Sequence, residues 1–235
     1  MLNNFKNIFA DQKQYHLFLL LCLTSLLDFA LIAYRIYFVG FDIGQIDSVR
    51  DVANTRSLTY MFLVWNLFLA WIPYFISLTL DYFPSKWLAA PALAIWLVFL
   101  PNAPYLVTDL LHVGYHPPVP MWYDMMILFS FAWTGLMLGF ISLVDVQKYL
   151  EKNTTKKVAN ILTWTAIGLC SFGVYLGRYQ RWNTWDIIAQ PYQLFMEILA
   201  VVTHPLAYLG SLGLAVVMAG VLSLGFLTVR TLVRE

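Results

Sequence analysis

Apolar runs of roughly 20 residues or more recur along the whole chain and alternate with short polar segments. A helix of about that length crosses the hydrocarbon core of a bilayer, which is about 30 Å thick. We therefore predict six spanning helices, over about residues 15–39, 57–82, 86–101, 120–149, 158–182 and 204–229. The pattern predicts an all-α, polytopic transmembrane helical bundle in which residues 1–235 form a single integral membrane domain.

One further apolar stretch, residues 184–203, differs from the six predicted spans. Polar residues and a proline interrupt it, at Gln190, Pro191, Gln193 and Glu197. We interpret it as an interfacial or re-entrant helix before the last span, and a seventh spanning helix is the alternative.

Composition agrees with this pattern. Of the 235 residues 60% are hydrophobic and only 11% are charged, and the mean hydropathy is +0.69, far from the balance of a soluble domain. The bilayer is thus the expected partner. A net charge of +1, with no basic patch interleaved with aromatic residues, argues against nucleic acid. Cys22 and Cys170 both lie in apolar runs, which argues against a disulfide framework or a thiolate metal site.

The first apolar run lacks a small-residue cleavage site and continues to about Val39, so we expect a retained helix rather than a signal peptide.

The charges that flank the spans predict the orientation. With six spans, the basic residues on one side of the membrane are Lys6, Lys13, Lys86, Lys148, Lys152, Lys156, Lys157, Arg230 and Arg234. The basic residues on the other side are all arginines. By the positive-inside rule both termini are cytoplasmic, which suits a bacterial cytoplasmic (inner) membrane. A seven-span topology would place Arg230 and Arg234 outside, which argues against it.

Two prolines, Pro101 and Pro104, interrupt the third predicted span. The helix reaches them after about 16 residues, or about 24 Å, which is short of the full hydrocarbon thickness. Because proline breaks helical hydrogen bonding and disfavours helix in the residue before it, we expect an irregular segment from Pro101 to Tyr105. Backbone of that kind is tolerated at membrane depth only beside protein or water, so the break predicts a pocket.

Past the break, Tyr105, Asp109 and His112 are spaced by four and three residues and share one face if a helix resumes. A carboxylate and an imidazole three residues apart can bind one metal ion or exchange one proton. With Asp124 they form our candidate catalytic group, and the same three residues are our hypothesis for a metal site. The alternatives are a solvated helix end at His112 and, for Asp124, a carboxylate that complements a helix dipole.

Two arginines at the end of the fifth span, Arg178 and Arg181, can clamp a phosphate or carboxylate, or can neutralise nearby aspartates in a structural network. The predicted substrate-binding residues are Arg178, Arg181, Asn183, Asp186, Asn102, Tyr105 and Asn66. Asn66 and Asp28 lie inside spans, where a polar group is costly and is a functional candidate by default.

Small residues four apart also predict close helix packing, at Gly135 and Gly139 in the fourth span and at Gly173 and Gly177 in the fifth. We interpret them as contacts within the bundle, and the sequence leaves the oligomeric state open.

Four motifs carry a family resemblance: Asn66 to Pro73 (NLFLAWIP), Pro101 to Tyr105 (PNAPY) with Thr108-Asp109-Leu110, Trp122-Tyr123-Asp124, and Arg181 to Asp186 (RWNTWD). Together they resemble the bacterial membrane proteins known as domain of unknown function 1361, from the second span to the fifth. The resemblance implies a multi-pass bacterial membrane protein and transfers no catalytic role. Thr184 stands where we expect serine in such proteins, a conservative difference.

These observations favour a membrane-embedded hydrolase or transferase with an extracytoplasmic-facing polar pocket and a lipid-linked or amphiphilic substrate. The sequence does not identify a cofactor, and a divalent metal ion is the candidate that hydrolysis or group transfer at such a site suggests. A small-solute transporter or permease is the main alternative, because Asp28, Asn66 and the interrupted third helix can line a route across the bilayer. A non-catalytic membrane assembly partner is the third hypothesis.

Overall fold

The computed structural model describes residue 9 and residues 12–40, 58–114 and 116–234. In this part of the chain every regular element is helical. The helices are α2 (Gln12–Val39), α4 (Met61–Thr79), α5 (Lys86–Phe99), α6 (Asn102–Thr108), α7 (Met121–Asn153), α8 (Lys156–Tyr179), α9 (Asp186–Ala189), α10 (Pro191–Thr203) and α11 (Leu209–Arg234). Three short 3-10 helices, η3 (Leu80–Tyr82), η4 (Asp109–His112) and η5 (Pro205–Tyr208), extend or precede them.

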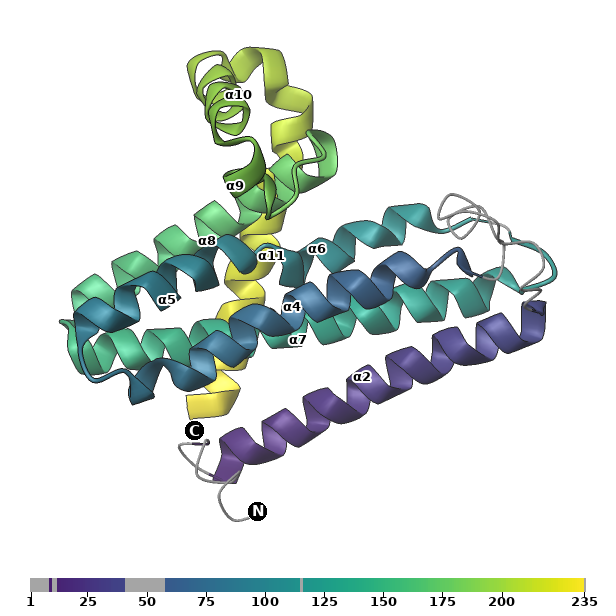
Figure 1. Ribbon diagram of the computed structural model, residues 1–235, viewed down its shortest axis with the longest axis horizontal. Coiled ribbons are helices and arrows are strands. Elements are labelled where there is room, and N and C mark those ends of the chain that lie inside the picture. The colour runs from purple at the N-terminus through teal and green to yellow at the C-terminus, as the bar shows by residue number, and fades with distance from the viewer. Residues whose placement is uncertain (1–8, 10–11, 41–57, 115, 235) are drawn as a thin grey trace.

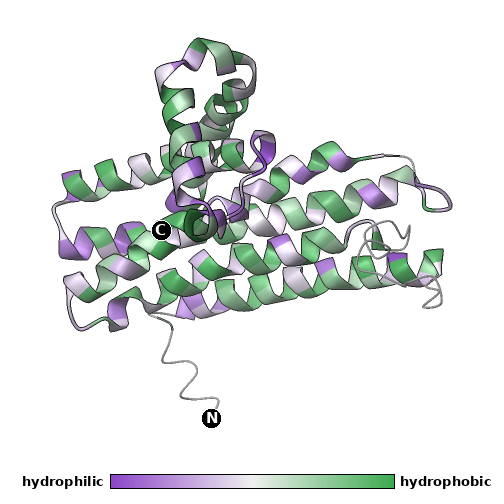
Figure 2. Cartoon of the chain, turned by 45° about the horizontal axis from the view of Figure 1, so that its top comes forward, coloured by the Kyte–Doolittle hydropathy of each residue, from purple (hydrophilic) through white to green (hydrophobic). Residues whose placement is uncertain are grey.

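Six helical segments of the described residues are long and apolar enough to cross a membrane. They are Gln12–Val39, Met61–Tyr82, Lys86–His112, Met121–Asn153, Lys156–Tyr179 and Pro205–Val233. The predicted all-α bundle of six spans is therefore confirmed. Figure 2 shows hydrophobic residues along most of each long helix, with hydrophilic residues gathered at helix ends and where the α9–α10 segment joins the bundle.

The segment before the last span forms the short helices α9 and α10. The 13 residues of α10 extend about 20 Å, which is too short to cross the hydrocarbon core. This confirms an extra short apolar helix rather than a seventh span. In Figure 1, α9 and α10 stand out from the end of α8, beyond the helices that run lengthwise.

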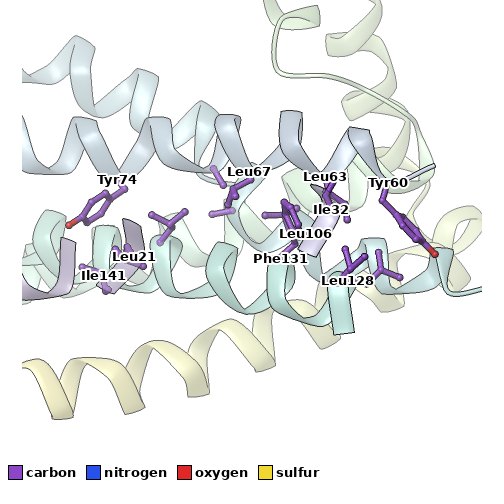
Figure 3. Packing of buried hydrophobic residues seen from close by; sticks show 14 of the residues in the cluster. Leu21, Ile32, Tyr60, Leu63, Leu67, Tyr74, Leu106, Leu128, Phe131 and Ile141 are labelled. Carbon is purple, nitrogen blue, oxygen red and sulfur yellow. The ribbon is translucent and has the colours of Figure 1, made fainter. Parts of the chain in front are cut away.

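Helix α7 is the centre of the bundle. It packs against α2, α4, α6, α8 and α11, and it is the most buried of the six spans. A helix with neighbours on several sides must be apolar around most of its circumference, as this one is. Figure 3 shows Leu63 and Leu67 of α4 facing Phe131 of α7 and Leu106 of α6, all four fully buried.

The backbone between Pro101 and Tyr105 differs from our prediction. We expected an irregular, extended segment, and the structure instead has a single turn followed by α6. Leu100 and Pro101 keep right-handed helical dihedrals, and the Leu100 N–H still bonds the Trp96 carbonyl at 2.8 Å. Pro104 lies in the first turn of α6, where an N–H has no intrahelical partner to lose. The prolines therefore kink the span and restart it rather than ending it.

Glycines let α6 approach its neighbours closely. A Cβ built on Gly135 of α7 would lie 2.5 Å from the Ala103 carbonyl oxygen, and one on Gly173 of α8 would lie 2.5 Å from Cγ of Pro101. Both distances are too short for a real side chain, so glycine is required at these two positions. The kinked span is thereby held against α7 on one side and α8 on the other.

Candidate functional site

A cavity of about 710 Å³ lies over α6, between α4 on one side and α8 with the α9–α10 segment on the other. Its polar lining contains most of the predicted site residues: Asn66, Asn102, Tyr105, Asp109, His112, Arg178, Arg181 and Asn183. The kinked third span and the end of the fifth thus meet at one pocket. Asp124 and Asp186 are not part of the lining.

Asp109 is the buried centre of this pocket, with 1% of its surface exposed. Its Oδ2 accepts a hydrogen bond of 3.0 Å from the Asn66 amide. Its Oδ1 lies 3.6 Å from Nη1 of Arg178 and 3.7 Å from Nδ1 of His112. A buried carboxylate needs such partners, and three of the predicted residues supply them from α4, η4 and α8.

His112 occupies the wetter edge of the pocket. Nearly half of its side chain is exposed, and its ring packs against Phe62 with centroids 5.2 Å apart. Nδ1 lies 3.3 Å from the Asp109 carbonyl oxygen as well as near the carboxylate. The imidazole can therefore exchange protons with water while it stays close to Asp109.

The two arginines differ in their surroundings. Arg178 faces Asp109, whereas Arg181 is exposed and has no hydrogen-bond or ion-pair partner within the described part of the chain. Arg181 also adopts a φ of +59°, a left-handed conformation that long side chains rarely take. It follows the end of α8, where the Trp182 N–H returns to the Leu176 carbonyl at 3.3 Å. A strained residue whose cation faces a cavity is typical of a binding site.

The segment between α8 and α9 is tied to α6. Asn102 donates a hydrogen bond of 3.0 Å from its amide to Oγ1 of Thr184. Asp186 accepts from the Asn183 backbone N–H at 2.7 Å, so its carboxylate shapes this turn instead of lining the cavity. The family motif of Arg181 to Asp186 therefore builds one wall of the pocket.

Sequence reasoning missed the aromatic part of the wall. Trp65 and Trp185 both line the cavity, with ring centroids 6.4 Å apart, and Trp182 donates a hydrogen bond to Glu197 of α10. None of these tryptophans is among the site residues that we predicted from the sequence. The side-by-side placement of Trp65 and Asn66 on one helix was the available signal for a mixed aromatic and polar wall.

Asp124 belongs to a different, buried cluster. Its Oδ1 pairs with Nε of Arg35 at 2.8 Å, and its Oδ2 lies 3.3 Å from both the Tyr60 hydroxyl and Nδ1 of His116. Tyr60 immediately precedes the α4 span. Its pKa is raised to about 12, mainly because the hydroxyl is buried and to a smaller extent because the negative charge of Asp124 lies nearby. The hydroxyl therefore stays protonated and donates to Asp124.

The three candidate metal ligands, Asp109, His112 and Asp124, consequently do not share one centre. We had considered Arg178 or Arg181 as the cation that neutralises nearby aspartates. For Asp124 that cation is Arg35 of α2. No group of three or more His, Cys, Asp or Glu side chains within the described residues is arranged to hold a metal ion.

Asp28 is buried between α2 and α7, away from the pocket lining. It accepts a hydrogen bond from Ser130, and its Oδ2 has no hydrogen-bond partner among the residues that the structure describes. The structure does not bring it together with Asn66, the other polar residue that we placed inside a span.

Residues 65–222 match the model of a family described as protein of unknown function (DUF1361). The match begins at the pocket residue Trp65 and extends into the last span, over more than half of the chain. No significant match to a curated protein or to a solved structure was found.

Proposed function

The chain belongs to the DUF1361 family of proteins of unknown function, and we propose that it is a membrane-embedded hydrolase or transferase acting on an anionic, lipid-linked or amphiphilic substrate. One observation carries the proposal. One cavity is lined both by a buried carboxylate, Asp109, and by an arginine, Arg181, that no acidic side chain of the described residues neutralises.

The lining supports a division of roles. Arg181, together with Arg178, holds the anionic group of the substrate through charge-assisted hydrogen bonds. Asp109 takes a proton from the attacking water or acceptor hydroxyl, and the imidazole of His112 returns a proton to the leaving oxygen. Asn66 and Arg178 hold the carboxylate in place, because they contact different oxygens of it. Acid–base assistance of this kind contributes roughly 10²- to 10⁴-fold in rate.

We further propose that the protein resides in the cytoplasmic membrane of a bacterium, with both termini inside and the pocket toward the extracytoplasmic side. The distribution of lysines supports this orientation, since all of them flank the other ends of the spans.

Purified protein in nanodiscs tests the proposal. The discs contain phosphatidylglycerol and a tracer of polyprenyl diphosphate, and mass spectrometry follows new lipid products and released phosphate. Wild type should turn over one of these lipids, and Asp109→Asn should lose at least about 100-fold in rate.

Asp81→Asn is the matched control, because Asp81 is an exposed carboxylate that pairs with Lys152 away from the pocket. Equal product formation by Asp109→Asn and wild type, or no product from either, rejects the proposal.

One observation favours a small-solute transporter as the second candidate. Asp28 is fully buried in a span, and within the described part of the chain one of its oxygens lacks a hydrogen-bond partner; such carboxylates often carry protons or ions. Solute-driven proton flux into liposomes that falls in Asp28→Asn, but is unchanged in Asp109→Asn, would support transport over enzymatic activity. A non-catalytic assembly partner is less well supported, because it needs no accessible cavity.

A further inference from the structure

The pocket lining has two chemically different parts. Asp109, His112 and Arg178 supply ionisable groups, and Leu69 and Val98 supply apolar surface. A purely water-soluble ion would use only the polar part, so the apolar part needs a separate explanation.

The positions of these residues along their helices give their depth. Val98 is 12 residues after Lys86, where α5 begins, which corresponds to about 18 Å along the span. Leu69 is 13 residues before Tyr82, or about 20 Å from the same end of the bundle. His112 is about 39 Å along the third span by the same measure. With a hydrocarbon core of about 30 Å, Val98 and Leu69 lie at acyl-chain depth and His112 lies near the opposite boundary.

Two lining residues of the pocket, Val98 and Trp65, are exposed on spanning helices. Helix α6 packs against both α4 and α8 and forms the floor between them, as the order of these helices in Figure 1 also shows. Val98 lines the cavity and is nevertheless 36% exposed, and Trp65 is exposed as well. Both residues belong to spanning helices, so the part of their surface that no protein covers is open to the bilayer or to the cavity.

We propose that the pocket opens sideways into the bilayer between α4 and α8 and takes a long-chain lipid with one negative charge, whose acyl chain lies along Val98 and Leu69. This inference rests on the proposed function for the headgroup end of the pocket and names the class and route of its substrate. Arg178 and Arg181 against Asp109 leave one excess positive charge, which suits a phosphodiester. Trp65 and Trp185 lie where aromatic side chains accompany lipid headgroups.

Photo-crosslinking in nanodiscs tests this proposal independently of turnover. The probe is phosphatidylglycerol with a diazirine at the end of one acyl chain, present as a tracer in phosphatidylcholine. We expect labelled peptides from α4, α5 or α8 that contain cavity residues. Val98→Trp should lower this labelling about tenfold, since it displaces roughly two buried methylene groups of the chain. Ile95→Trp is the matched control, because Ile95 lies on the same helix, is 50% exposed and does not line the cavity.

Competition on the wild-type protein provides a second test that needs no variant. Unlabelled long-chain phosphatidylglycerol should displace the probe, whereas dihexanoyl phosphatidylglycerol and inorganic phosphate at equal concentration should not. Displacement by the short-chain lipid or by phosphate, or equal labelling of the two tryptophan variants, overturns lateral lipid binding. Either result leaves the proposed function intact if the Asp109→Asn effect on turnover persists, so the two failures are distinguishable.

Discussion

Asn66 on α4 donates a hydrogen bond of 3.0 Å to the carboxylate of Asp109, which directly follows α6. Two residues 43 positions apart, each on a different span, thus meet inside the pocket. The bond joins the two motifs that begin at Asn66 and at Pro101, and it explains why a carboxylate with 1% exposure is tolerated at this depth.

Removing this amide should destabilise the bundle. We expect Asn66→Leu to cost about 1–3 kcal/mol, because one oxygen of a buried carboxylate loses its donor. Thermal unfolding in detergent measures the loss. The double variant Asn66→Leu/Asp109→Leu should regain part of it, since the unsatisfied acceptor is gone. Purely additive losses in this double-mutant cycle would show that the two side chains do not interact.

The Arg35–Asp124 pair should matter for stability and not for chemistry. Both side chains are almost completely buried, so Asp124→Ala removes a buried, charged partner of Arg35 and should cost about 3–5 kcal/mol. Asp81→Ala, which breaks an exposed ion pair, should cost about 1 kcal/mol or less. The measurement is the unfolding midpoint together with turnover per folded molecule. An Asp124→Asn protein that folds like wild type but is inactive would return Asp124 to the catalytic group.

Glycine should be required where α8 meets the kink. Gly173→Ala places a Cβ 2.5 Å from Pro101 and should cost about 1–3 kcal/mol. Gly168→Ala is its control on the same helix, because nothing lies within 4 Å of the added Cβ, and the change should be neutral or stabilising by about 1 kcal/mol. Similar unfolding midpoints for the two variants would mean that α6 is not held by close contact with α8.

The sequence predicted the architecture well because bilayer thickness constrains helix length. Six spans and one short helix followed from run lengths and from the polar interruptions after Gln190. The Pro101 region was the exception. Proline rules describe lost hydrogen bonds, but Pro104 lies in the first turn of α6, where no intrahelical bond is lost, and α7 and α8 pack closely against this segment at Gly135 and Gly173.

The site was predictable in part for the same reason. Topology placed Asp109, Arg178 and Arg181 at one face, and the structure gathers them around one cavity. Topology does not specify which neighbours pair, so the partner of Asp124 was missed. Arg35 lies 89 positions from Asp124 in the sequence, and only the packing of α2 against α7 brings them together.

If Arg181 binds the anionic group of a ligand, the lipids that the protein retains should depend on this cation. Native mass spectrometry of the protein, released from nanodiscs with equal phosphatidylglycerol and phosphatidylcholine, gives the preference for the anionic lipid. Arg181→Asn removes the cation while asparagine tolerates the left-handed backbone, and Arg230→Asn removes a cation outside the pocket. We predict that wild type and Arg230→Asn prefer the anionic lipid and that Arg181→Asn loses this preference by roughly 10- to 100-fold. An unchanged preference in Arg181→Asn would contradict the account.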